Sequence, residues 1–466
     1  MRKRFVVALL LAAAVQAPAQ TNAPGPDTQD WPLHPAVNWF YRWQEDWSVL
    51  ADPSLRTDPF DPIKYIPIGS DPNSYLSLGL TVRERVESLS FSLTPVQPDD
   101  YLIDRTQLHA DLHLGSHVQI FTQLIDARAA GKSVLAPIDQ DRVDLEQAFI
   151  AVTVPVGGDQ LKFTVGRIEP ELDMQRFADI QDGPNVRQPF DSVSAWYTHG
   201  DWRAVAFYSE PVQLRDRSPF DDVTSRRFAL TGTRVTRGNL GHGRISLFAA
   251  QLRNDKAFYL ASAGQERRNV IDMHYAGRAA GWDWDVEGMG QAGHVGERKI
   301  RAWGGGVLFG YTWASRPLSP RLGLQFDTAS GNHNPNAGAL GTFNPLFPNG
   351  FYEMLAGYPG YANFVHLRST AMVHPTKTIS TLFNVGAQWR QTTADAAYLL
   401  PDIPVAGTAG RGSAYSGTYG QIRFDWEISR HMTAVLDTEY FAHSQSLQQA
   451  GARNGLFIGV ELRFGF

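Results

Sequence analysis

Residues 456–466, LFIGVELRFGF, alternate between apolar and polar side chains almost without a break. Apolar side chains occupy Leu456, Ile458, Val460, Leu462, Phe464 and Phe466. Between them come Gly459, Glu461, Arg463 and Gly465, and Phe457 is the one exception. Because successive side chains of a β-strand point to opposite faces, this stretch predicts a strand with one apolar and one charged face.

The same alternation recurs from Tyr75 onward in segments of about ten residues, the length that a tilted strand needs to cross a bilayer. In QIRFDWEI, residues 421–428, one face carries Ile422, Phe424, Trp426 and Ile428, and the other carries Gln421, Arg423, Asp425 and Glu427. A soluble β-sandwich or β-solenoid would also alternate, and that alternative stays open. Two details favour a barrel in lipid: strands that carry charges of both signs on one face, and aromatic side chains at strand ends, namely Trp282, Trp303, Tyr311, Trp313, Trp389 and Tyr440.

Connection lengths give an independent indication of a barrel. Short connections at 114–117, 199–201, 315–320, 374–377 and 429–431 mostly alternate with long ones at 168–189, 329–361 and 392–414. Outer-membrane barrels have an even number of strands, short periplasmic turns and long extracellular loops. We therefore expect an all-β protein, a transmembrane antiparallel β-barrel of about 18 strands.

The chain begins with MRKRFVVALLLAAAVQAPA, in which a basic start is followed by an apolar run too short to span a membrane as a helix. This predicts a signal peptide over 1–19, a periplasmic lead-in over 20–74 with a short helix near 38–50, and a barrel over 75–466. Cleavage would remove three bases and no acids, which takes the net charge from −5 to −8. This charge argues against a nucleic-acid partner, and the 466 residues include no Cys.

The expected location is the bacterial outer membrane, with its lipid as the surrounding partner. The final Phe466, in phase with the apolar row, resembles the C-terminal aromatic signal that the barrel-assembly machinery reads. A periplasmic partner of an export system is a further expectation. We expect no cofactor and no metal.

Charged residues on the polar faces of the predicted strands are candidates for the pore lining: Arg83, Arg85, Arg105, Asp144, Glu146, Arg321 and Asp327. A second group lies in a polar stretch that is long enough to fold into the barrel and narrow it: Arg167, Glu169, Arg176, Asp179, Asp182, Asn185, Arg187 and Asp191. Guanidinium groups bind carboxylates in a bidentate way, so Arg167, Arg176 and Arg187 would attract anionic solutes. The plainer interpretation is a solvated wall whose charges pair across strands.

Three stretches together resemble the alginate export protein family. They are residues 45–87, EDWSVLADPSLRTDPFDPIKYIPIGSDPNSYLSLGLTVRERVE; residues 164–191, with TVGRIEP and QRFADIQDGPNVRQPFD; and residues 326–348, with FDTASGN and TFNPLFP. The resemblance implies an eighteen-stranded outer-membrane barrel that conducts an anionic polyuronate passively through an arginine-rich lumen.

The function expected is therefore a porin that passes anionic or polar saccharides or small carboxylates, with polyuronate export among the candidates. The alternatives are a barrel hydrolase and a plugged structural barrel. Paired carboxylates such as Asp283 and Asp285 could serve glycoside hydrolysis. Mixed charge is also ordinary in a water-filled lumen, so we predict a protein that is not an enzyme and assign no catalytic residue.

Overall fold

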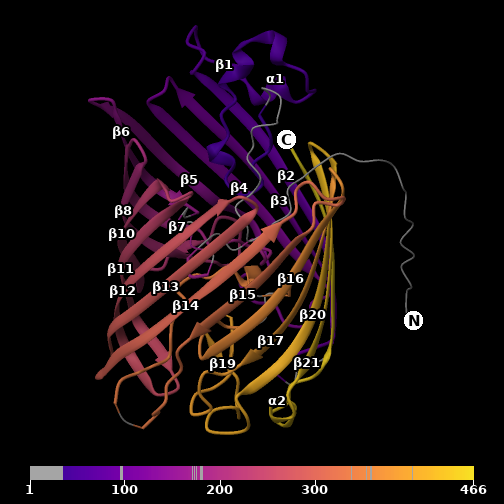
Figure 1. The fold of residues 1–466 in the computed structure, drawn as a ribbon. Helices are drawn as coiled ribbons and strands as arrows, with labels where there is room; N and C mark the ends of the chain where they lie inside the picture. Colours follow the sequence, from indigo (N-terminus) through magenta and orange to yellow (C-terminus); the bar gives the residue numbers. More distant parts are fainter. Residues whose placement is uncertain are drawn as a thin grey trace.

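The alternating segments form strands that pair with their neighbours around a closed antiparallel barrel, which has eighteen long strands in the part of the chain that the structure describes (Figure 1). The computed structural model describes residues 35–94, 98–169, 172, 174, 176–178, 182–336, 338–352, 354–356, 359–400 and 402–466. The barrel closes where the first and last long strands pair, from Thr81 opposite Gly465 to Leu89 opposite Phe457. The predicted fold class is confirmed.

The long strands are β2 (Tyr75–Leu89), β3 (Asp99–Leu114), β4 (Val118–Ala130), β5 (Asp141–Val156), β6 (Asp159–Ile168), β7 (Phe190–His199), β8 (Trp202–Gln213), β10 (Phe228–Leu240), β11 (Gly243–Tyr259), β12 (Ser262–Ala279), β13 (Trp282–Val295), β14 (Arg298–Thr312), β15 (Arg321–Ala329), β16 (Phe364–Thr376), β17 (Ile379–Trp389), β20 (Tyr415–Ser429), β21 (Met432–His443) and β22 (Gly455–Gly465). Four strands of two residues are β1 (Ile66–Pro67), β9 (Val223–Thr224), β18 (Tyr398–Leu399) and β19 (Ile403–Pro404). The short helices are α1 (Asp61–Lys64) and α2 (Gln445–Gln449), with 3-10 turns η2 (Arg42–Gln44), η3 (Ser48–Ala51), η4 (Pro53–Leu55) and η5 (Gly350–Tyr352). Among the described residues, no helix is long and apolar enough to cross a membrane.

The two faces of each strand differ as the sequence pattern predicts. On β22, Val460 is 52% exposed, whereas its neighbour Glu461 is 3% exposed because it faces the barrel interior. Phe457, the one apolar residue out of phase, also faces inward and packs with Phe441 and Met354. The outward row of β22 is therefore apolar, as a lipid-facing surface requires, and its inward row is polar apart from Phe457 and the glycines.

Connections differ sharply between the two ends of the barrel. At one end they are short, at 115–117, 157–158, 200–201, 241–242, 280–281, 313–320, 377–378 and 430–431. At the other end lie the long loops, at 90–98, 131–140, 169–189, 214–227, 330–363, 390–414 and 444–454, together with two tight turns at 260–261 and 296–297. The turn at Gly157 and Gly158 has φ angles of 59° and 99°, a left-handed backbone that suits tight hairpins and that glycine adopts without strain.

The lead-in, described from residue 35 to residue 74, covers the short-turn end of the barrel. The C-terminus lies at the same end (Figure 1). The stretch expected to form a short helix near 38–50 instead contains the 3-10 turns η2 and η3, because prolines follow closely and no apolar helical face develops. Phe60 stacks on Phe466 with ring centroids 4.2 Å apart. Arg42 donates to the Phe466 carbonyl and, through Nη1, to the Thr81 hydroxyl at 2.7 Å.

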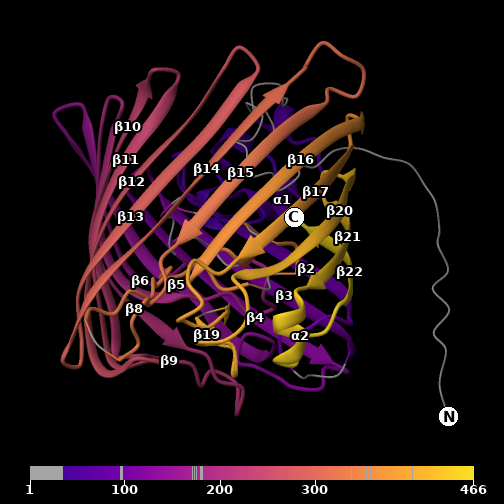
Figure 2. The ribbon, with the colours of Figure 1, turned by 60° about the horizontal axis from the view of Figure 1, so that its bottom comes forward.

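Long loops occupy part of the barrel interior. Figure 2, turned so that the long-loop end comes forward, shows the chain between β15 and β16 within the ring of strands. Its Leu340 and Phe343 join Phe177 of the 169–189 loop in an apolar cluster packed on Phe248 and Ile300 of the wall. This cluster fills the interior on the β10–β14 side.

Candidate functional site

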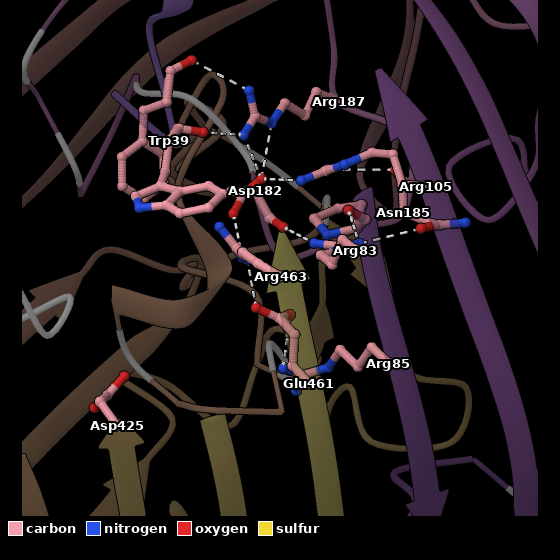
Figure 3. Close-up of polar contacts among 12 residues, drawn as sticks. Trp39, Arg83, Arg85, Arg105, Asp182, Asn185, Arg187, Asp425, Glu461 and Arg463 are labelled. Atoms are coloured by element: carbon pink, nitrogen blue, oxygen red, sulfur yellow. Dashed lines mark hydrogen bonds and ion pairs between the residues drawn. The ribbon is translucent and has the colours of Figure 1, made fainter. Parts of the chain in front are cut away.

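The 169–189 loop, which connects β6 and β7, enters the barrel and is held there by a carboxylate at its centre. The Asp182 carboxylate accepts hydrogen bonds from Arg105 at 2.6 Å, from Arg187 at 2.7 Å and from Arg463 at 2.6 Å (Figure 3). Arg105 belongs to β3 and Arg463 to β22, so one loop residue joins strands from both ends of the chain. We call Asp182 with Arg83, Arg105, Arg187 and Arg463 the Asp182 cluster.

Arg83 of β2 completes this cluster through the loop backbone. Its guanidinium donates to the Asp182 carbonyl at 2.7 Å, and to the Pro184 carbonyl and the Asn185 side-chain oxygen at 3.1 Å each (Figure 3). The Nε atoms of Arg83 and Arg105 are buried and have no hydrogen-bond partner in the described part of the chain. These two N–H groups keep an unused donor capacity.

Arg187 connects the loop to the lead-in at the short-turn end. Its guanidinium donates to the carbonyls of Trp39 at 3.0 Å and Phe40 at 3.2 Å, and its Nη1 lies 3.3 Å from Glu169. The lead-in is therefore part of the same polar network as the loop. A movement of the lead-in or of the loop would therefore change the hydrogen bonds that Arg187 makes in the Asp182 cluster.

Asp182 stays ionised because its arginines outweigh its burial. Burial alone would raise the pKa of this carboxyl, but Arg187, Arg463 and Arg105 hold the pKa well below its ordinary value. Glu169 differs, because burial and the nearby Glu146 raise its pKa, while Arg187 opposes the rise. Arg463 also pairs with Glu461 of β22 at 2.5 Å, so the four guanidinium groups face two charged carboxylates, and the cluster keeps an excess of positive charge.

Arg176 holds the same loop to a different arc of the wall. Its guanidinium pairs with Asp327 of β15 at 3.0 Å and with Glu287 of β13 at 3.3 Å, and it also contacts Asp285. Asp327 in turn lies 3.2 Å from His366. The loop is thus fastened to the wall at two points, at Arg176 and at Asp182.

Other predicted lining residues face inward outside these two anchors. Arg85 pairs with Glu461 at 3.3 Å and with Asp437 at 3.2 Å, next to the Asp182 cluster. Glu146 accepts from two glutamines at 2.7 Å each. Arg321, near the short-turn end, donates from Nε to Asp283 at 2.8 Å.

Three predicted residues lie elsewhere, and one is not described. Arg167 and Asp191 were expected in the loop, but both are strand residues that face each other across β6 and β7, with an ion pair of 3.0 Å. By alternation they share the outward face with the exposed Val165 and Val193, because β6 continues through Ile168 before the chain turns inward. Asp144 lies at the long-loop rim, away from the Asp182 cluster. Asp179 lies outside the described residues.

Sequence reasoning missed a cavity of about 160 Å³ along the inner faces of β5 to β8. Two cation and tryptophan pairs mark it: Lys162 lies 5.1 Å from the ring centre of Trp43, and Arg203 lies 4.4 Å from that of Trp196. The hydroxyl residues that line it are Thr153, Thr164, Ser192, Ser194, Thr198 and Ser209. The alternation of Ser192, Ser194, Trp196 and Thr198 in DSVSAWYT was the available signal, since these residues occupy one face of β7.

Comparisons with solved structures show the fold of an outer-membrane porin. The outer membrane protein OpdK from Pseudomonas aeruginosa superposes with a TM-score of 0.58 at 10% identity, over 84% of this chain and 98% of that one. OccK2 (OpdF) from the same organism, solved in complex with glucuronate, gives a TM-score of 0.55 at 12% identity, over 84% and 95%. A BenF-like porin from Pseudomonas fluorescens Pf-5 gives 0.57 at 10% identity, over 84% and 98%. At these identities the likeness is one of fold alone.

Sequence comparison is informative at the level of the family. No curated protein matches the chain. A family model described as alginate export matches residues 74–461, which covers the barrel from the start of β2 to within the last strand. The chain therefore belongs to the alginate export family.

Proposed function

We propose that the protein is a channel of the bacterial outer membrane that passes small organic acids, each with a ring and a carboxylate, such as sugar acids or aromatic acids. The observation that carries the proposal is the cavity along β5 to β8, which is lined by cations, aromatic rings and hydroxyls. The cavity adjoins the 169–189 loop, which we call the anchored loop. Because the cavity lies inside the barrel, a solute that crosses the lumen could bind there on its way.

Each kind of lining group suits one part of such a solute. Lys162 and Arg203 offer cations to a carboxylate, and Trp43 and Trp196 offer flat faces to a ring. The hydroxyls of the inner wall can replace the water that a sugar loses on entering a narrow site. Few ligand classes other than a ring with a carboxylate would use all three groups.

The two ends of this path have the same sign of charge. The Asp182 cluster contributes four guanidinium groups around one carboxylate, and the cavity adds Lys162 and Arg203. Glu169 also lines the cavity, but it pairs with Arg187 at 3.3 Å, so a small anion moving between the two cationic sites would meet this carboxylate beside an arginine. A long polyuronate would need wider clearance, because the loop is tied to two arcs of the wall by buried ion pairs.

The printed names of two structural neighbours fit this solute class. OccK2 was solved with glucuronate and OpdK with vanillate, each of which has a six-membered ring with a carboxylate. Those ligands are properties of those proteins, and they supply the two probes for this one. The pairing of Asp283 with Arg321 also favours transport over hydrolysis. A carboxylate held in an ion pair on the barrel wall is poorly placed to act as one of the two carboxylates of a glycoside hydrolase.

The test is conductance of the refolded full chain in planar bilayers, with glucuronate, vanillate or uncharged glucose added on one side. We expect brief blockades of the current by the two acids at concentrations at which glucose gives none. Arg203→Gln should shorten the blockades and weaken acid binding about tenfold, because a cation facing the carboxylate is lost while the wall is retained.

A matched control lies on the outside of the same wall. Arg237 stacks over Trp202 at 5.3 Å, in the same kind of contact as Arg203 over Trp196, but on the outward face. Arg237→Gln should leave the blockades as in the parent. Equal effects of the two substitutions, or no blockade by either acid in a conducting parent, would contradict the proposal. Alginate oligomers that block more strongly than both monomeric acids would favour polymer export instead.

A further inference from the structure

Three carboxylates converge at the long-loop rim, away from the Asp182 cluster. Asp141 and Asp144 come from the start of β5, and Asp222 comes from the loop that follows β8. One oxygen from each lies within 4.8 Å of the other two. Asp141 and Asp144 are each 2% exposed, so they meet in a place that water reaches poorly.

The local backbone brings the two strand residues to the same face. Residues three apart on a regular strand face opposite ways, but the pairing of β4 with β5 shifts register twice, between Gln123 and Leu124 and between Ile125 and Ala127. Val143, between the two carboxylates, has a φ of 53°. Such bulges redirect side chains, and here they turn both Asp141 and Asp144 inward.

The third carboxylate is fixed by contacts to the second. The backbone N–H groups of Asp221 and Asp222 donate to Asp144 Oδ2 at 2.8 Å and 3.2 Å. The backbone N–H of Phe220 donates to the Val143 carbonyl at 3.1 Å. The 214–227 loop is therefore bound to the start of β5 in a defined position, and the approach of the carboxylates is not a chance contact between loose segments.

Among the described residues, none of the three carboxylates forms an ion pair with a base, although the charge of Arg167 acts on Asp222. The nearby bases are engaged elsewhere: Lys132 with Asp139 at 2.6 Å, Arg142 with Asp216 at 2.7 Å, and Arg167 with Asp191 at 3.0 Å. The Asp141 carboxylate, which contributes one oxygen to the cluster, has a buried Oδ1 without a hydrogen-bond partner among the described residues. A buried carboxylate oxygen without a partner costs free energy that a bound cation would recover.

We propose that Asp141, Asp144 and Asp222 bind a calcium ion that fastens the 214–227 loop to the rim of the barrel. Carboxylate oxygens are the ligands that Ca²⁺ prefers, and its irregular coordination tolerates donors from a bulged strand and a loop. Mg²⁺ fits less well, because it demands regular octahedral geometry and keeps several of its waters. Asp141 and Asp144 are buried, which leaves little room beside them for a heavily hydrated ion, whereas the partly exposed Asp222 would face the open side of the site.

The ion would also stabilise the anchored loop, because the same rim supports it. The Val186 backbone N–H donates to the Ile138 carbonyl at 2.8 Å. The Asn185 amide donates to the Asp139 carbonyl at 3.0 Å, two residues before Asp141. Calcium at the rim would therefore hold the strand start from which Asn185 is positioned, and through Asn185 it would hold Arg83.

The test is calorimetric titration of CaCl2 into the full chain, refolded in detergent and freed of metal with a chelator. We expect one ion per chain with a Kd of about 10⁻⁴ to 10⁻³ M, the range of extracellular calcium modules, and weaker binding of MgCl2. Asp141→Asn and Asp222→Asn should each weaken calcium binding by at least about tenfold, since each removes one of three charged ligands. The control is Asp126→Asn, which alters an exposed carboxylate paired with Arg128 on the neighbouring β4.

A second readout separates a metal site from simple charge repulsion. In chelator, Asp141→Asn should unfold on heating at the same temperature as the parent or higher, because a repulsion is removed. Calcium should raise the unfolding temperature of the parent and of Asp126→Asn, and should leave both cluster variants unchanged. A parent that responds to calcium no more than its cluster variants, or that binds Mg²⁺ as tightly as Ca²⁺, would overturn the assignment. If Asp141→Asn fails to refold, Asp222→Asn decides the question alone.

Discussion

Replacing Asp182 with asparagine should loosen the anchored loop and make the channel more anion-selective. Asparagine keeps the size of the side chain and one acceptor oxygen but removes the charge. Arg105, Arg187 and Arg463 would then face one another at short range without the carboxylate that now accepts a hydrogen bond from each.

The size of the effect follows from burial. Asp182 is 3% exposed, and removing one partner of a buried ion pair costs about 3–5 kcal/mol. The retained amide oxygen places this substitution at the lower end, about 3 kcal/mol. Since about 1.4 kcal/mol corresponds to a factor of ten, the population of loops released from the wall should rise about 100-fold.

Hydrogen exchange at the Val186 amide reports this release, because its N–H is bonded to the Ile138 carbonyl only while the loop is docked. We expect exchange in the 183–189 segment to accelerate about 100-fold in Asp182→Asn. In planar bilayers under a salt gradient, the reversal potential should move toward that of the anion, because one negative charge is lost from the narrow region.

Asp191→Asn is the matched control, because Asp191 also pairs with an arginine but does so between strands on the outward face. It should change neither the exchange rate of Val186 nor the selectivity. The reasoning is refuted if Asp182→Asn leaves Val186 as protected as in the parent and the reversal potential unmoved.

Three further outcomes are expected. Deleting Phe466 should keep the barrel out of the outer membrane, and a deletion that retains the heat-dependent gel mobility of the parent would contradict this. Cysteine in place of Asp425 should react with a water-soluble thiol reagent, whereas cysteine in place of Trp426 should not; the reverse pattern would place the polar face in lipid. Burial, opposed by Glu45, lowers the pKa of Lys64 from its ordinary 10.5 to about 8, so the docked lead-in binds fewer protons than the free one. Docking should therefore strengthen by up to about 3 kcal/mol as the pH rises from about 8 to 10.5. Lead-in proteolysis should slow over that range in the parent, while a Lys64→Met variant that keeps the same pH dependence would exclude this cause.

The fold was predictable because one physical contrast repeats along the chain. A strand between lipid and a polar lumen must alternate at every second residue, so the faces of β20 and β22 could be assigned before any contact was known. The short and long connections followed from spacing alone. The lead-in was less predictable, since Arg42 and Trp47, in or next to its 3-10 turns, bond to Thr81 and Tyr75 of β2, and such contacts leave no periodic pattern in the sequence.

The candidate site was predictable only in part. A long polar stretch with arginines indicated a loop that enters the barrel, and Asp182, Asn185 and Arg187 do so. Alternation could not tell where β6 ends, so Arg167 was assigned to the loop although it continues the strand. The partners of Asp182 could not be predicted from the sequence, because Arg105 and Arg463 lie 77 and 281 residues away and meet Asp182 only when the barrel is closed.

The position of Asp182 also constrains the order in which the molecule can fold. Every long strand pairs with its neighbour in sequence except at the β2–β22 seam, so the sheet can grow hairpin by hairpin and must close last. That final step joins the most distant parts of the chain and bears the largest loss of chain entropy. Asp182 binds Arg105 of β3 on one side of the seam and Arg463 of β22 on the other, so it links the two strand regions that meet when the barrel closes. The 169–189 loop can therefore be fully seated only in a barrel that has already closed, and an unfinished barrel would lack the contacts that hold this loop in place.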